Sequence, residues 1–176
     1  MREVIANQLT QFEHPNYNRG DIESRVRQAE QNLIMELEKN YFDNGQIELI
    51  DSELLDMFDN LRINGIKIAL NTGYNIQTQE NIIRKLNMNE FIDNYVSSEQ
   101  VKFGRPHPYM INRLMIMNNI NNPYNVIKIG DTENDVLEGL NAQCGLSIGV
   151  LSGSGDVYDL SKSHLIMNSV MDLKIN

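Results

Sequence analysis

Residues 127–135 read Ile-Lys-Ile-Gly-Asp-Thr-Glu-Asn-Asp, so an apolar strand pattern leads straight into a turn with two carboxylates four positions apart. In an open α/β sheet, ligands gather beyond the carboxyl ends of the strands, where Asp131 and Asp135 could hold a hard cation such as Mg2+ through oxygen. An ordinary helix start explains the same residues, because Thr132 is a good N-cap and Glu133 and Asp135 complement the helix dipole. This stretch alone favours neither interpretation.

Apolar runs and helical patterns alternate on both sides of this stretch. The pattern predicts strands at 66–70, 95–97, 126–129 and 146–150, with an edge strand at 165–167. Because strands that alternate with helices form parallel sheets, we predict an α/β fold, a Rossmann-like three-layer arrangement around a parallel sheet.

The N-terminal part has a different pattern. Apolar residues recur there every three or four positions, namely Ile22, Val26, Ala29, Leu33 and Leu37, with charged residues between them. This spacing predicts helix up to about residue 40. We therefore predict a helical segment at 1–45 and an α/β domain at 46–176.

Composition limits the classes of function. The chain has 176 residues, of which 41% are hydrophobic, and this supports a globular chain with one domain, or with one domain and a small addition. Its net charge of −9 argues against nucleic acid or an anionic membrane as a partner. One cysteine excludes an internal disulfide, and there is neither an apolar stretch of membrane-spanning length nor a signal-like start. We expect a cytoplasmic protein.

Polar groups suited to phosphate chemistry follow three of the predicted strands. They are Asn71, Thr72 and Gly73 after the first, Arg105 after the second, and Asp131 with Asp135 after the third. A hydroxyl and backbone N–H groups can hold phosphate oxygens, an arginine can neutralise charge, and carboxylates can fix Mg2+ against the same group. Taken singly, Thr72 could be a turn residue and Arg105 part of a surface ion pair.

Together these segments resemble the haloacid dehalogenase superfamily. Its second motif is an apolar strand ending in Thr or Ser, its third supplies Lys or Arg, and its fourth is a Gly-Asp pair followed by another Asp; Thr72, Arg105 and Asp131 with Asp135 match them. Residues 70–74, 103–111 and 130–142 look like the phosphonoacetaldehyde hydrolase (phosphonatase-like) branch, to which the Arg in place of the usual Lys also points. The resemblance covers nearly the whole chain.

The resemblance implies Mg2+-dependent hydrolysis of a small phosphorylated or phosphonate metabolite. It implies catalytic roles for Thr72 and Arg105, phosphate binding by Asn71, Thr72, Gly73 and Arg105, and metal binding by Asp131 and Asp135. It also implies that 1–45 is the remnant of a helical cap, and that 46–176 is the core without its first strand.

Two parts of the family's site have no counterpart in the sequence. The family's first motif, Asp-x-Asp or a near variant, supplies the Asp that attacks phosphorus, and we find no such motif and no replacement. The branch also uses a cap Lys that forms an imine with the aldehyde. Residues 2–5 resemble the segment directly after that Lys, but Arg2 is a poor substitute because a guanidinium stays protonated.

We therefore expect a phosphonatase-like chain that binds Mg2+ weakly and is inactive by itself. The alternative is a non-catalytic module that binds an anion or a protein. By the resemblance, the absent strand belongs between the strands predicted at 66–70 and 126–129, so either the pairing is altered or two edges stay unpaired. Unpaired edges could recruit a strand-supplying partner or a second copy of the chain.

Overall fold

The structure, a computed structural model, describes residues 24–26, 28–29, 32–33, 36 and 47–173. The chain divides into two compact units, residues 1–47 and 48–176. In the first unit, the described residues between 24 and 36 are helical, as the periodicity predicts, while most of the helix predicted up to residue 40 lies outside the described residues. That the first unit is a cap remnant stays a prediction.

The second unit alternates helices and strands in the predicted order. Its elements are α3 (Leu54–Ile63), β1 (Ala69–Thr72), α4 (Ile76–Lys85), β2 (Asn94–Ser97), α5 (Tyr109–Met117), β3 (Ile127–Gly130), α6 (Glu133–Asn141), β4 (Leu146–Val150) and β5 (Leu165–Met167). Residues 47–173 also contain three short 3-10 helices: η2 (Ser98–Gln100), η3 (Pro123–Asn125) and, after β5, η4 (Val170–Asp172). The strands predicted at 146–150 and 165–167 have the predicted bounds.

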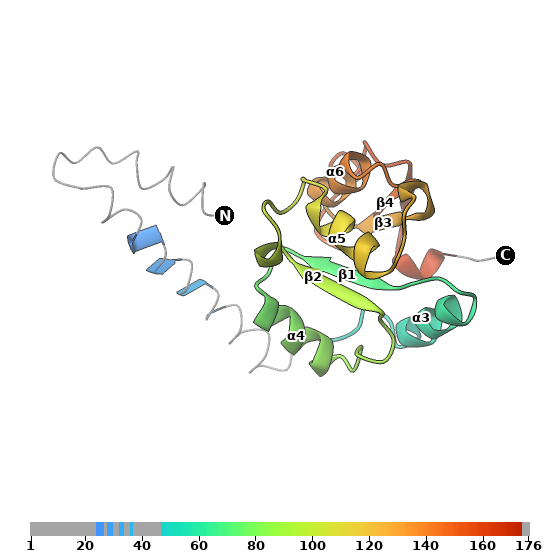
Figure 1. Cartoon of the computed structure of the whole chain (residues 1–176), viewed down its shortest axis with the longest axis horizontal. Coiled ribbons are helices and arrows are strands. Elements are labelled where there is room, and N and C mark those ends of the chain that lie inside the picture. Colours follow the sequence, from blue (N-terminus) through green and yellow to red (C-terminus); the bar gives the residue numbers. More distant parts are fainter. Residues whose placement is uncertain (1–23, 27, 30–31, 34–35, 37–46, 174–176) are drawn as a thin grey trace. The chain divides into compact units, whose positions relative to one another are not determined.

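The strands form two parallel sheets (Figure 1). β1 pairs with β2, and β3, β4 and β5 pair in that order, every pair being parallel. This confirms the predicted α/β class with interleaved helices. Within the described residues β1 and β3 do not pair with each other, so of the two expected arrangements the structure has the one with unpaired edges.

The strand predicted at 66–70 was wrong in its bounds, because β1 runs from Ala69 to Thr72. Before Ala69, hydrogen bonds to Asp93 take the place of strand pairing. The Asp93 carboxylate accepts a hydrogen bond from Ile68 N at 2.9 Å, and the backbone N–H of Asp93 donates to Ile68 O at 2.7 Å. Lys67 and Arg62 pair with the same carboxylate at 3.1 and 3.3 Å. Burial raises the pKa of Asp93, but these contacts outweigh it and lower the pKa below its usual value.

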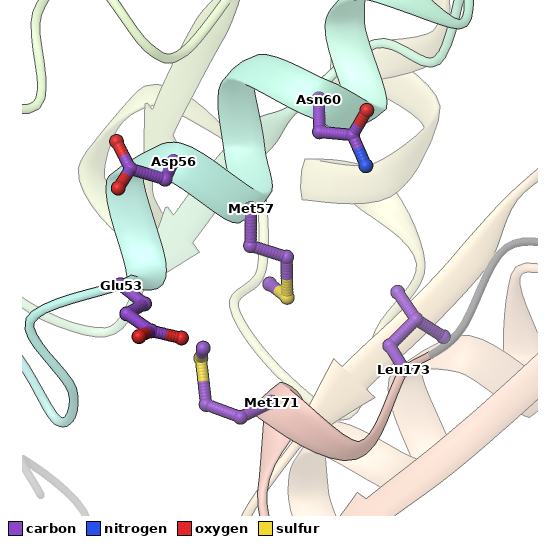
Figure 2. A pocket seen from close by; sticks show the side chains of 6 residues that line it. All are labelled: Glu53, Asp56, Met57, Asn60, Met171 and Leu173. Carbon is purple, nitrogen blue, oxygen red and sulfur yellow. The ribbon is translucent and has the colours of Figure 1, made fainter.

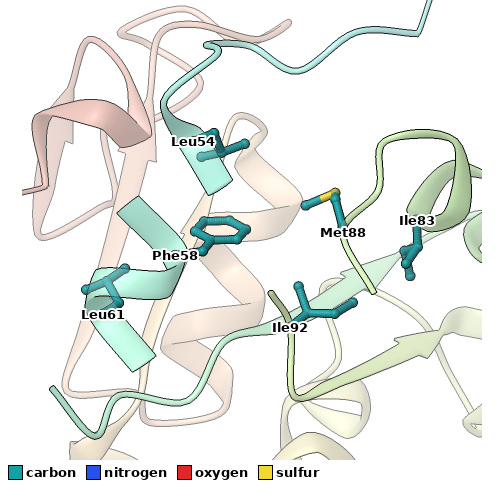
Figure 3. Packing of buried hydrophobic residues seen from close by; sticks show 6 residues of the cluster. All are labelled: Leu54, Phe58, Leu61, Ile83, Met88 and Ile92. Carbon is teal, nitrogen blue, oxygen red and sulfur yellow. The ribbon is translucent and has the colours of Figure 1, made fainter. Parts of the chain in front are cut away.

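Helices cover both faces of the β1–β2 sheet. On one face, α3 and α4 enclose the cluster of Leu54, Phe58, Leu61, Ile83, Met88 and Ile92, drawn in Figure 3. Leu70 of β1 and Tyr95 of β2 pack against this cluster. The next residue of β2, Val96, packs instead against Met110 and Leu114 of α5. Since successive strand residues point to opposite faces, α5 covers the face opposite α3 and α4.

The second sheet is covered by α6, which packs on β3 and β4. Ile111 of α5 packs against Ala142, which follows the last residue of α6, and against Cys144 in the turn after it, so α5 and α6 are neighbours. Burial, with the nearby Glu138, raises the pKa of the Cys144 thiol to about 11, which makes it a poor nucleophile. Within the described residues, no helix is long and apolar enough to cross a membrane.

Candidate functional site

The turn after β1 is held by serines at the end of β2. Thr72 ends β1, and its hydroxyl accepts a hydrogen bond from Tyr74 N at 3.2 Å. The hydroxyl of Ser98 donates to Gly73 O at 3.1 Å, and that of Ser97 donates to Tyr74 O at 2.8 Å. Gly73 is exposed at the tip of this turn. Sequence reasoning missed both serines, although their place at the end of a predicted strand was a signal.

Arg105 joins this turn to the start of α6. Its guanidinium forms an ion pair and hydrogen bond with Asp135. It also lies beside the turn, because a Cβ added to Gly73 would be 3.7 Å from Arg105 Nη2. The side chain is 21% exposed, so one part of it is open to solvent. Arg105 therefore connects the turn after β1 with the start of α6, and a common phosphate site for Thr72, Arg105 and Asp131 stays a prediction.

Asp135 is buried, and both of its carboxylate oxygens have partners. Besides Arg105, Oδ1 pairs with Lys128 Nζ at 2.9 Å, while Oδ2 accepts a hydrogen bond from the Thr132 hydroxyl at 2.6 Å. Burial raises the pKa of Asp135, but Lys128, Arg105 and Thr132 together lower it below its usual value. Thr132 also accepts from Asp135 N and caps α6, so the predicted N-cap is confirmed.

Asp131 follows β3 and is held by the loop after β4. Its Oδ2 accepts hydrogen bonds from Ser154 N at 2.8 Å and from the Ser154 hydroxyl at 3.0 Å. Its main-chain oxygen accepts from Gly155 N at 2.9 Å. No described residue forms a hydrogen bond or ion pair with its Oδ1. Asp131 thus differs from Asp135 in having one carboxylate oxygen that a ligand could take.

A buried charged network lies beside these residues. Lys128 Nζ donates to Asn71 Oδ1 at 2.8 Å and pairs with Glu138 Oε2 at 3.2 Å, and Asn71 Nδ2 donates to the same Glu138 oxygen at 2.8 Å. Glu138 is fully buried, and its Oε1 has no hydrogen-bond partner among the described residues. The amide of Asn71, expected to bind phosphate, is thus engaged at both atoms by this network.

Sequence reasoning missed Lys128 and Glu138. The available signal was a lysine between two isoleucines within an apolar strand, since a charge in that position needs a partner.

The carboxylate oxygens at this site are ligands that could hold Mg2+ only weakly. The described part of the chain contains no group of three or more His, Cys, Asp or Glu side chains that could hold a metal ion. A free carboxylate oxygen on Asp131 still matches the preference of Mg2+ for oxygen ligands, and this ion usually keeps several of its waters. Binding by Asp131 and Asp135 therefore stays a prediction.

A separate open pocket of about 330 Å³ lies between α3 and η4 (Figure 2). It is lined by Glu53, Asp56, Met57, Asn60, Met171 and Leu173. None of the residues predicted for the site is among them, so this pocket is not part of the candidate site.

Comparison with protein families matches residues 4–143 to the family described as haloacid dehalogenase-like hydrolase. A phosphonoacetaldehyde hydrolase from Parabacteroides distasonis is 37% identical over 105 residues, which cover 59% of this chain and 39% of the relative. One from Latilactobacillus sakei is 33% identical over 134 residues, covering 72% of this chain and 50% of the relative. The chain thus spans half or less of the length of these two curated relatives.

Solved structures show the same fold. The β-phosphoglucomutase of Clostridium difficile has a TM-score of 0.72 at 19% identity, over 98% of this chain and 72% of that one. A phosphonoacetaldehyde hydrolase-like protein from Oleispira antarctica has a TM-score of 0.71 at 21% identity, over 98% and 69%. At such identities the likeness supports the fold alone. Because the family match covers most of the sequence, this chain belongs to the haloacid dehalogenase-like hydrolases and is related to phosphonoacetaldehyde hydrolases.

Proposed function

We propose that this chain carries the phosphate- and metal-supporting part of a site for Mg2+-dependent hydrolysis of a small phosphorylated or phosphonate metabolite. The observation that carries the proposal is the position of Arg105, which lies beside the turn after β1 and pairs with Asp135 at the start of α6. A phosphate group at Gly73 and Thr72 would then lie near both the guanidinium and the carboxylates.

Each residue has a chemical role in this proposal. Thr72 and the backbone N–H groups of the turn hold phosphate oxygens, and Arg105 neutralises their charge through paired N–H donors. Asp131 offers Oδ1 to the metal, and Asp135 keeps Arg105 and Lys128 in place. A direct bond from Asp135 to the metal requires it to give up one of its present partners. A bound Mg2+ would polarise the phosphoryl oxygens and balance their charge.

Phosphate binding tests this proposal. Arg105→Ala should weaken the binding of inorganic phosphate in the presence of Mg2+ by about 10-fold or more, because a hydrogen bond to a charged group contributes about 1.5–3 kcal/mol. Arg105→Lys keeps the positive charge but loses the paired N–H donors, so it should lose less phosphate affinity than Arg105→Ala. Isothermal titration calorimetry measures both dissociation constants.

The matched control is Arg113→Ala. Arg113 lies on α5 and is exposed, and its guanidinium donates to the main-chain oxygen of Gln100. This variant should bind phosphate as the unchanged protein does. Equal affinities in all the variants would show that phosphate does not bind at Arg105, and the proposal would fail.

We also propose that the chain is catalytically incomplete by itself. β1, β2 and β4 end in Thr72, Ser97 and Val150, none of which is a carboxylate. The aspartates at the start of α6 are already assigned to the metal and to Arg105. No described aspartate is therefore left at the end of a strand to attack phosphorus.

The second candidate is a binding module, and the unpaired edges of β1 and β3 favour it. Asn71 of β1 and Lys128 of β3 both contact Glu138 of α6, so these strands lie under the same helix. α5 and α6, which are neighbours, cover the first and second sheet respectively. The two sheets are thus parts of one layer, and a strand from another protein chain could pair with the free edges.

Hydrogen exchange distinguishes the binding module from a closed sheet. Backbone amides of β1 and β3 that point to a free edge should exchange quickly in the purified chain, whereas those of β4, paired on both sides, should exchange slowly. Mass spectrometry of proteolytic peptides reports the exchange rates of β1, β3 and β4 in one experiment. Equal protection of β1, β3 and β4 would mean that the edges are covered, and this candidate would lose its support.

A further inference from the structure

We propose that Ser154 is a positioning residue that turns Asp131 toward a divalent cation. The inference rests on the proposed role of Asp131 as a metal ligand and adds a residue that lies outside the family motifs matched by Thr72, Arg105, Asp131 and Asp135.

Ser154 places both of its donors on the same oxygen of Asp131. The backbone N–H and the hydroxyl reach Oδ2 at 2.8 and 3.0 Å. Two hydrogen bonds to one oxygen fix the rotation of the carboxylate about its side-chain bonds. Because Oδ2 is occupied in this way, Oδ1 is the oxygen left for an ion.

The backbone around Ser154 is shaped to approach Asp131 closely. A Cβ at Gly153 would overlap the Asp131 carboxylate, and a Cβ at Gly155 would overlap the Asp131 main-chain oxygen. Gly155 N also donates to that main-chain oxygen at 2.9 Å. Glycine on both sides of Ser154 thus lets the loop close around the aspartate.

The register of the sheet brings this loop to Asp131. β3 and β4 are parallel neighbours, and Gly130 at the end of β3 is opposite Gly149 near the end of β4. Asp131 therefore starts the turn after one strand, and residues 151–155 form the loop after the next. Two segments about twenty residues apart in sequence meet at the same edge of the sheet.

A carboxylate that is already fixed in its binding orientation has a higher affinity for an ion than one that must become ordered when the ion binds. Partners that orient a metal ligand typically change metal affinity by about 10- to 100-fold when they are removed. Ser154→Ala removes the hydroxyl but keeps the backbone donor, so we expect the lower end of this range. Ser154→Thr keeps the hydroxyl and should restore most of the affinity.

The experiment measures the affinity of the chain for Mn2+, which serves as a probe for Mg2+. The electron paramagnetic resonance signal of the free ion reports how much Mn2+ stays unbound. Ser154→Ala should bind about 10-fold more weakly than the unchanged chain. Ser161→Ala is the matched control, because Ser161 is exposed and its hydroxyl donates to Tyr158 O, away from Asp131. The metal-free melting temperatures of Ser154→Ala and Ser161→Ala should agree, since a role in folding alone would separate them.

Asp131→Asn separates the inference from the proposed function. If Asp131→Asn and the unchanged chain bind Mn2+ equally, Asp131 is not a ligand, and both the metal site and the inference fail. If Asp131→Asn loses binding while Ser154→Ala keeps it in full, the metal site stands and Ser154 does not position the aspartate. Gly153→Ala retains the Ser154 hydroxyl but adds a methyl group that crowds the Asp131 carboxylate, so it should also weaken Mn2+ binding. An unchanged Mn2+ affinity in this variant would contradict the proposed close approach of the loop to Asp131.

Discussion

The purified chain is expected to release no phosphate from phosphonoacetaldehyde or p-nitrophenyl phosphate in the presence of Mg2+. Hydrolysis in this family, as the resemblance implies, passes through attack by an aspartate on phosphorus. Removing the attacking group of a covalent mechanism can cost about 10⁶-fold in rate and leaves only positioning and electrostatic effects. In our proposal Thr72, Arg105 and a bound ion hold a phosphate group, but no described residue is assigned to attack it.

The measurement is phosphate release by highly purified protein, with the Latilactobacillus sakei relative as the positive control. Asp131→Asn and Arg105→Ala are prepared in parallel. A trace rate that is the same in all three preparations indicates a contaminating phosphatase and leaves the prediction intact. Turnover by the unchanged chain that Asp131→Asn abolishes would show that the chain contains a nucleophile, and the proposal of an incomplete site would be wrong. An incomplete site and a binding module would both bind ligand without releasing phosphate, so this turnover would contradict both proposals.

Lys128→Met is expected to lower the free energy of unfolding by about 3–5 kcal/mol, the usual cost of removing one partner of a buried ion pair. Lys128 is buried and contacts Asp135, Glu138 and Asn71. Methionine fills a similar volume but supplies no charge, so among the described residues Glu138 would lose its cationic partner and Asp135 would keep only Arg105. Urea denaturation followed by circular dichroism measures the change.

Lys162→Met is the matched control for this substitution. Lys162 pairs with Glu133 at 2.7 Å, but both side chains are half exposed, so this variant should lose less than about 1 kcal/mol. Equal losses for Lys162→Met and Lys128→Met would mean that the buried network does not stabilise the fold.

The effect of Lys128→Met should also depend on pH. The pKa of Asp135 is lowered in the folded protein, so its stabilising contribution is present above the unfolded value of about 3.9 and is lost as pH falls through the folded pKa. Lys128 is one cause of that lowered pKa. The difference in the free energy of unfolding between the unchanged chain and Lys128→Met should therefore be largest above about pH 5 and should become smaller below about pH 4.

Local patterns were enough to predict most of the elements, whereas the family was inferred from the resemblance of its motifs. The spacing of Leu54, Leu55, Phe58 and Leu61 predicts one apolar face for a helix here; in α3, Leu54, Phe58 and Leu61 are buried and Leu55 is partly buried. The same kind of pattern predicted β4 with its bounds and the parallel class of the sheets. Thr132 as an N-cap is equally local, because the cap and the amide that it accepts from lie three residues apart. Such features depend on neighbours in sequence, and periodicity reports on those neighbours.

Contacts between distant segments could not be predicted in this way. The start of β1 depends on Asp93, which is 25 residues away from Ile68, and Asp131 is held by Ser154, 23 residues away. Lys128 meets Asn71 across 57 residues, in a network that joins the two sheets. Periodicity indicates that a position is buried but does not identify the group it faces, because that depends on how strands and helices pack. The residues predicted for the site were therefore visible in sequence, whereas the partners that hold them in place came from tertiary packing.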